Sequence, residues 1–298
     1  MKKIYAMPGM FFLILAQTMV GINIVTSKLL LTDIPVMVLL EIRFALAAFI
    51  LLLLHWVVPI KKRPIKVYLL ALQRKDWYFL LAQALTAGFL FNALMLTGLN
   101  YTDANVAGII TSALPAMIAV ISWLVLKEKI TTQTVICISF ATIGLLIISY
   151  SKLQGVSEVH SFFGDAIILL SLLPEATYYV LCKLYSNRLP VFLTSALLNG
   201  VNALFLFPVI LYMPFVSLHV SSFSWVILCL IGLSSGLFYV FWSLGAQRVD
   251  AVMASLSTAI MPVATVILAW AILHEQLTGL QLLGMLLVIL SVFVYARK

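Results

Sequence analysis

Three charged side chains lie within long apolar segments of the sequence, where a folded chain would have to bury them. Glu41 and Arg43 follow Pro35 by six and eight residues. Glu175 follows Gly164 by eleven residues. If these segments are helices that cross a bilayer, the rise of ~1.5 Å per residue places Glu41 and Arg43 roughly 9 and 12 Å into the span, and Glu175 near its midplane. A charge at that depth costs about 3 kcal/mol, so each needs a partner or a water-filled cavity.

Glu41 and Arg43 cannot easily pair with each other, because residues two positions apart on a helix point about 200° away from one another. In a functional interpretation, Arg43 is the counter-charge of a substrate carboxylate, and Glu41 or Glu175 binds an amine or carries a titrating proton. In a structural interpretation, Arg43 bonds backbone carbonyls or forms a buried pair with Glu175. Pro174 interrupts the helical hydrogen-bond ladder beside Glu175, which favours a cavity role for this carboxylate.

Further polar and aromatic residues recur at helical spacing, so that each group shares one face of its helix. Such faces would suit a cavity for an amphipathic organic solute, although Asn, Ser and Tyr also serve as ordinary contacts between membrane helices. These second-rank candidates are Tyr178 and Tyr179, Asn199 and Asn202, and Tyr239, Trp242 and Ser243.

The composition indicates which elements must hold these residues. Hydrophobic residues make up 64% of the 298 residues and charged residues 9%, against about 25% in a typical soluble domain. The mean hydropathy is +1.16. A soluble surface cannot be built from this chain, so an all-α integral membrane protein is predicted. The apolar run from Gly9 to Leu31 is too long for a signal peptide and is expected to be a retained span.

Apolar runs of about 17 to 25 residues predict ten transmembrane helices with short connections. Five belong to a first half, residues 1–150, and five to a second half, residues 151–298. The predicted helices lie near residues 9–31, 36–58, 77–99, 104–126, 132–150, 163–184, 191–213, 223–245, 251–273 and 279–296.

Lysine and arginine are distributed unevenly between alternate connections. With ten spans, 15 of the 18 basic residues lie on the side of the two termini, whereas the opposite side holds Lys28 and Lys152. The positive-inside rule therefore predicts cytoplasmic termini and a multi-pass protein of the inner membrane. The net charge of +8 is spread over several short loops, which argues against binding to nucleic acid.

The two halves are related by an internal repeat. Ten identities without a gap join residues 98–131 to residues 245–278 at an offset of 147, among them Gly98 with Gly245 and Pro115 with Pro262. Earlier in each half the offset is 155. Because each half holds an odd number of spans, the second must cross the membrane in the opposite sense, which predicts an inverted repeat. Such repeats can open alternately to the two sides of a membrane, as carriers do.

Four repeated residues are candidates for gating. Pro115 and Pro262 each free a backbone carbonyl one turn earlier, which would serve either flexure or close packing. Glu128 and Glu275 end the fourth and ninth predicted helices, near opposite membrane surfaces. They would serve symmetric gates at the two mouths, or simply be solvated.

The sequence resembles the EamA family of the drug/metabolite transporter superfamily over essentially its whole length. The resemblance is carried by Gly21, Asn23 and Lys28, by Pro35 with Arg43-Phe44, by Pro115 to Lys127-Glu128, and by the repeat of this stretch from Asp250 to His274-Glu275-Gln276. It implies a ten-helix carrier with a central cavity between the halves, often an exporter of amino acids or related metabolites.

Other classes of membrane protein lack their signatures here. The sequence has no HExxH, no Asp-rich diphosphate motif, no serine elbow and no P-loop, so neither an enzyme nor an ATP-driven pump is expected. Cys137, Cys182 and Cys229 have no paired spacing, so no metal or other cofactor is expected. The expected partners are a small-molecule substrate, the lipid bilayer and protons as a candidate coupling ion, and the expected state is a monomer or a weak homo-oligomer.

Overall fold

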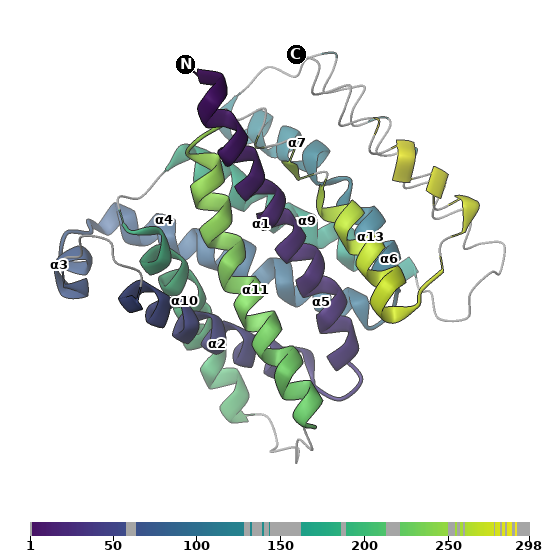
Figure 1. Ribbon diagram of the computed structural model, residues 1–298, viewed down its shortest axis with the longest axis horizontal. Helices are drawn as coiled ribbons and strands as arrows, with labels where there is room; N and C mark the ends of the chain where they lie inside the picture. The colour runs from purple at the N-terminus through teal and green to yellow at the C-terminus, as the bar shows by residue number, and fades with distance from the viewer. Residues whose placement is uncertain are drawn as a thin grey trace.

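The computed structural model describes most of the predicted helices. Described are residues 2–57, 64–127, 162–185, 189–212, 221–249, 260–276 and 278–280, together with 132, 139, 143, 254, 257–258, 282–283, 285–287 and 290. All regular elements in this part of the chain are helices (Figure 1). They are α1 (Lys2–Leu30), α2 (Val36–Val57), α3 (Ile65–Leu70), α4 (Arg74–Gln83), the π-helix η1 (Ala84–Leu90), α5 (Phe91–Leu99), α6 (Ala104–Thr111), α7 (Leu114–Leu126), α9 (Phe162–Leu184), α10 (Val191–Tyr212), α11 (Ser222–Ala246) and α13 (Ile260–Leu273).

Among the described residues, six helical segments are long and apolar enough to cross a membrane, and a seventh is added if the bent pair α6 and α7 counts as one span. The six are Gly9–Leu30, Val36–Val57, Arg74–Leu99, Phe162–Leu184, Val191–Pro208 and Ser222–Ala246. The predicted segments 132–150 and 279–296 lie largely outside the described residues, so the count of ten spans stays a prediction.

Two predicted helices are interrupted. The segment 104–126 consists of α6 and α7, which meet at 40°. Pro115 stands in the first turn of α7, where its missing N–H leaves no helical bond to a preceding carbonyl. The segment predicted at 77–99 begins at Arg74 and contains η1. The Asn92 amide stabilises this wider turn, because Nδ2 donates to the carbonyls of Ala87 at 2.8 Å and Gly88 at 2.6 Å.

The two halves of the chain interleave. The first helix of the first half, α1, packs against α11 and α13 of the second half (Figure 1). Correspondingly, α9 packs against α5 and against the pair α6 and α7. The second helices α2 and α10 pack against each other, as do α6 and α13. Every one of these contacts joins one half to the other.

Glycines allow the closest of these contacts, and the contacts recur at the repeat offsets. A Cβ on Gly98 would lie 2.5 Å from Ile168 Cγ1 and 2.9 Å from the Gly164 carbonyl. A Cβ on Gly245 would lie 2.6 Å from Leu13 Cγ and 2.9 Å from the Gly9 carbonyl. Gly245 is the repeat partner of Gly98, and Leu13 and Gly9 are those of Ile168 and Gly164. The same close contact between a helix of one half and a helix of the other therefore occurs twice, at repeat-equivalent positions.

The outer surface of the helices is strongly apolar. Trp56, Val57, Leu204, Phe223 and Trp270 are each more than 60% exposed. Apolar surface on this scale is typical of contact with lipid rather than with water. The exposed side chains therefore agree with a multi-pass membrane protein.

Candidate functional site

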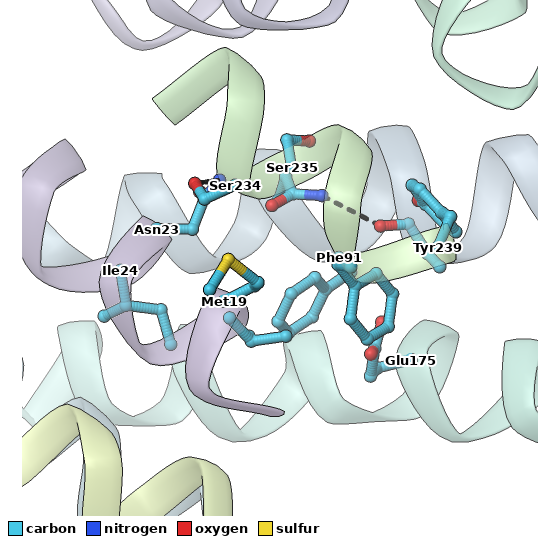
Figure 2. A pocket seen from close by; sticks show the side chains of 12 residues that line it. Met19, Asn23, Ile24, Phe91, Glu175, Ser234, Ser235 and Tyr239 are labelled. Carbon is cyan, nitrogen blue, oxygen red and sulfur yellow. Dashed lines mark hydrogen bonds between the residues drawn. The ribbon is translucent and has the colours of Figure 1, made fainter. Parts of the chain in front are cut away.

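A small cavity of about 30 Å³ lies between α1, the η1–α5 segment, α9 and α11. Figure 2 shows side chains from these elements converging on it. Such a volume holds about two water molecules, so in this conformation the cavity, which is partly open, is too small for a metabolite. The residues that line it are Met19, Val20, Asn23, Ile24, Ala87, Phe91, Asn92, Glu175, Ser234, Ser235, Phe238 and Tyr239.

The lining is built from equivalent positions of the two halves. At the offset of 147, Ala87 corresponds to Ser234, Gly88 to Ser235, Phe91 to Phe238 and Asn92 to Tyr239; at the offset of 155, Val20 corresponds to Glu175. Both members of four of these five pairs line the cavity. The cavity therefore lies where related parts of the halves meet. Its walls are chemically unequal, since the second half has a serine, a tyrosine and a glutamate where the first half has an alanine, an asparagine and a valine.

Glu175 lies in the wall that α9 contributes. Its side chain is 1% exposed, and among the described residues Oε2 has no hydrogen-bond partner. The Tyr179 hydroxyl donates to the carboxylate, and Gln17 Nε2 of α1 donates to the same hydroxyl at 3.2 Å. α9 runs through Pro174, which has no N–H, so the ladder lacks one bond directly beside Glu175. The structure thus places this carboxylate in the pocket with an unused acceptor.

Arg43 lies directly behind the pocket and is fully buried. Its Nη1 donates to Asn23 Oδ1 at 2.6 Å, and Asn23 Nδ2 in turn lies 3.4 Å from Ser234 Oγ. Among the described residues, Nε and Nη2 of Arg43 have no hydrogen-bond partner. The guanidinium carbon lies 4.7 Å from the centre of the Phe44 ring. Arg43 therefore reaches the pocket through Asn23, with two donor groups unsatisfied.

The aromatic candidates form a layer between α9 and α11. Tyr178 and Tyr239 lie 5.8 Å apart and Tyr179 and Trp242 lie 4.5 Å apart, measured between ring centroids. Of these four buried rings, Tyr239 alone lines the pocket. The others support its wall from behind. Ser243, which follows Trp242 in α11, is not among the lining residues.

The two asparagines of α10 are also buried behind the lining. Asn199 Nδ2 and Asn202 Nδ2 each donate at 2.9 Å to a carbonyl four residues earlier in α10. Ser235, which lines the pocket, lies with Oγ 3.5 Å from Asn199 Oδ1. Asn202 packs against Gly88 of η1.

Glu41 is half-buried in α2 and does not line the pocket. Its Oε2 has no hydrogen-bond partner within the described structure.

The gating candidates lie away from the pocket. Pro115 at the start of α7 and Pro262 in α13 are buried. Glu275 follows α13, and its carboxylate accepts hydrogen bonds from the backbone N–H groups of Ala104 and Asn105 at 3.0 and 2.7 Å. Glu128 lies outside the described residues.

Sequence reasoning did not select four polar lining residues: Asn23, Asn92, Ser234 and Ser235. The repeat carried a signal for one of them, because Asn92 is the repeat partner of the candidate Tyr239. Ser235 is the repeat partner of Gly88, which was not a candidate. Asn23 belongs to the residues that carry the family resemblance, but its contact with Arg43 depends on how α1 and α2 pack, which one sequence does not reveal.

Comparison with known proteins gives consistent results. The EamA-like transporter family model matches residues 7–150 and 162–297. The uncharacterized transporter YetK of Bacillus subtilis is 30% identical over 293 residues, which cover 95% of this chain and 85% of that protein. The uncharacterized transporter YyaM of the same organism is 28% identical over 255 residues, covering 84% of this chain and 81% of that protein.

The fold is also similar to a solved structure. A chain described only as "Crystal structure of protein" superposes with a TM-score of 0.63 at 17% sequence identity, covering 98% of this chain and 96% of that chain. At this identity the likeness shows a shared fold.

Proposed function

The chain belongs to the EamA-like transporter family, and on that premise we propose that it is a secondary carrier that exports small organic metabolites such as amino acids or related compounds. The observation that carries the proposal is the pocket, whose lining comes from repeat-related positions of both halves and includes a buried carboxylate with an unused oxygen. A site between two such halves is where alternating access requires the substrate to bind.

The charges around the pocket favour a solute that carries both signs. Arg43, behind Asn23, has two unsatisfied donor groups that match a carboxylate, and Glu175 has an acceptor that matches an amine or a proton. Phe91 and Phe238 give the pocket two apolar walls for the rest of the solute. Unsatisfied buried polar groups are costly, so a ligand that bonds them gains binding energy.

The architecture that we propose is an inverted repeat of ten spans in the inner membrane, with cytoplasmic termini. It is supported by the exchanged glycine contacts, by the interleaved helix packing and by the two segments that match the family model. The cavity holds about two waters, so a metabolite can enter only when the helices separate toward one side. Rocking of the halves around the pocket would provide that separation, driven by the gradient of the substrate or of protons.

The test is transport by the purified protein in proteoliposomes. Uptake and efflux of amino acids, nucleosides and cationic dyes would be followed at two pH values, with empty liposomes as the control. The proposal expects saturable transport of at least one zwitterionic metabolite. It is wrong if no solute moves faster than through empty liposomes while the protein remains folded and inserted.

A further inference from the structure

The helix α6 is capped by a residue from the other half of the chain. Its first two N–H groups, those of Ala104 and Asn105, donate to the carboxylate of Glu275. Asn105 Nδ2 also donates to the carbonyl of Gln276 at 3.3 Å. Glu275 thus neutralises the positive end of α6, where backbone N–H groups have no partner within the helix.

The same helix carries a residue suited to cap it locally. Asp103 directly precedes α6 with φ −81° and ψ 156°, the extended backbone of an N-cap residue, and Asp is among the residue types preferred there. Its side chain nevertheless makes no capping hydrogen bond. An N-cap side chain accepts from the second or third N–H of a helix. The second, that of Asn105, is occupied by Glu275 at 2.7 Å.

The backbone before Glu275 is held in a conformation that aims the carboxylate at α6. His274 has a φ of 56°, in the left-handed region that residues other than glycine seldom adopt. Such a residue costs on the order of 1 kcal/mol and persists where the surroundings hold it. Lys127, the repeat partner of His274, has a similar φ of 54° at the end of α7, so this turn is a feature of both halves. The Glu275 N–H donates to the Ala269 carbonyl of α13 at 3.4 Å, and the contacts of Glu275 and Gln276 with α6 join the turn to the first half.

Two further contacts fix the turn that precedes α6. Lys28 Nζ of α1 donates to the carbonyls of Leu99 and Thr102. Thr102 Oγ1 donates to Asp165 Oδ1 of α9 at 2.9 Å, a second connection between the halves. We call this region the Lys28 mouth: Lys28, residues 99–105, Asp165, Glu275 and Gln276.

The Lys28 mouth lies beyond one end of the pocket along α1. Asn23 lines the pocket, Ser27 follows one turn later on the same helix face, and Lys28 comes next. Ser27 is fully buried, and its hydroxyl has no partner within the described structure. Ser27, between Asn23 and Lys28 on α1, is therefore shielded from solvent in this conformation.

We infer that α6 exchanges its N-cap as the Lys28 mouth opens, with Glu275 capping the helix in the closed state and Asp103 capping it in the open state. The inference rests on the proposed function, since it assumes that the halves separate here. One carboxylate then replaces another at the start of α6: Glu275 accepts from the N–H groups of Ala104 and Asn105, whereas Asp103 would accept from that of Asn105 or Val106. The closed and open states then each have one carboxylate at the start of α6. Their free energies are therefore similar enough for both states to be populated.

The two caps predict opposite effects for two variants. The reporter is Ser27→Cys in a protein whose three native cysteines are replaced by alanine, labelled by a membrane-impermeant thiol reagent from the side of the Lys28 mouth. Glu275→Ala removes the closed-state cap and should raise the labelling rate, on the order of fivefold for the loss of one cap. Asp103→Ala removes the open-state cap and should lower the rate by a similar factor. The double variant should return close to the parent rate.

The controls separate capping from general damage. Asp33→Ala removes an exposed carboxylate from the turn after α1 and should leave the rate unchanged. Glu275→Gln and Asp103→Asn keep the side-chain size and should give smaller shifts of the same signs. Labelling is compared only between variants that keep the parent melting temperature in detergent.

Each outcome decides a separate point. Cap exchange is overturned if Glu275→Ala and Asp103→Ala, or their milder versions, shift the rate in the same direction or not at all. If they act oppositely but no metabolite is transported, cap exchange stands and the proposed carrier function fails. If transport is measured but the variants do not act oppositely, the carrier proposal stands and cap exchange fails.

Discussion

At the scale of single residues, the pocket combines two buried charges whose bonding capacity is incompletely used. Glu175 is bonded by Tyr179 on one side and has a free oxygen on the other, and Arg43 bonds Asn23 while two of its nitrogens have no partner in the described structure. Neither arrangement is the buried Arg43–Glu175 pair that the structural interpretation of the sequence offered, because Nη1 of Arg43 bonds Asn23 and no carboxylate of the described residues bonds Nε or Nη2. The charges remain available to a ligand.

Glu175→Gln should separate binding from coupling. Gln keeps the shape of the side chain and one carbonyl acceptor. It carries no negative charge and does not titrate near neutral pH. We expect the substrate to bind, measured by thermal stabilisation, whereas accumulation driven by a pH gradient in proteoliposomes is lost. Glu41→Gln is the comparison, because that carboxylate lies in α2 outside the pocket lining. Unchanged accumulation in Glu175→Gln would exclude Glu175 as the proton site, and loss in Glu41→Gln alone would move that role to Glu41.

Arg43→Ala should weaken transport of solutes that carry a carboxylate. A hydrogen bond to a charged group contributes about 1.5–3 kcal/mol, so the apparent affinity should fall by about tenfold or more. Arg43→Lys keeps the charge but loses the planar fork, and we expect it to lie between the parent and Arg43→Ala. The measurement is the concentration dependence of uptake for a zwitterionic substrate and for its carboxamide. If Arg43→Ala transports the zwitterion with parent affinity, Arg43 has a structural role only.

At the scale of elements, the apolar runs located the six membrane-length segments of the described structure within a few residues, because the length and composition of a membrane span follow from the bilayer thickness. The sequence did not reveal the wider turn of η1 or the 40° bend between α6 and α7. The carbonyls of η1 are bonded locally by Asn92, which lies only four and five residues farther along the chain. In contrast, α6 is fixed at its start by a tertiary contact with Glu275, which lies 171 residues later in the sequence. Pro115 indicated that a helical hydrogen bond is missing near residue 115, but it did not predict the angle between α6 and α7.

The closest contact between α5 and α9 should not tolerate a methyl group. In Gly98→Ala, the new Cβ would lie 2.9 Å from the Gly164 carbonyl, a backbone atom that cannot turn aside. We expect a loss of about 1–3 kcal/mol and a lower melting temperature in detergent, as is usual for overpacking. Gly200→Ala is the matched control in another membrane helix, since its nearest neighbour would be Ala48 Cβ at 3.9 Å. Equal melting temperatures for both variants would contradict the tight α5–α9 contact.

At the scale of the whole molecule, the described helices of the two halves pack across each other rather than as two separate bundles. A repeat found from identities at offsets of 147 and 155 therefore corresponds to contacts in space, such as Gly98 with Gly164 and Gly245 with Gly9.

The sequence predicted only some of the residues that line the pocket. Glu175 and Tyr239 line it, whereas Asn199, Tyr178 and Trp242 lie behind it. Helical spacing identifies a shared face but not which neighbouring helix that face meets.

The orientation of the chain can be tested directly. An even number of spans and the clustering of lysine and arginine predict that the C-terminus is cytoplasmic. A C-terminal fusion to green fluorescent protein should fluoresce, and the same fusion to alkaline phosphatase should be inactive in a bacterial host. An active phosphatase fusion would rule out cytoplasmic placement of that terminus.

The unequal walls of the pocket have a kinetic consequence. A carrier made of two identical inverted halves would present the same site to both faces of the membrane, and its half-saturation concentrations on the two sides would be equal. Here Glu175 is the repeat equivalent of Val20, Ser234 that of Ala87 and Tyr239 that of Asn92. With unequal walls, the half-saturation concentrations of the proposed carrier are expected to differ between the two sides, and so are its rates at saturating solute. At low concentration, and without a gradient to drive it, solute would still move equally fast in both directions, because the ratio of maximal rate to half-saturation concentration is the same on both sides of a passive carrier.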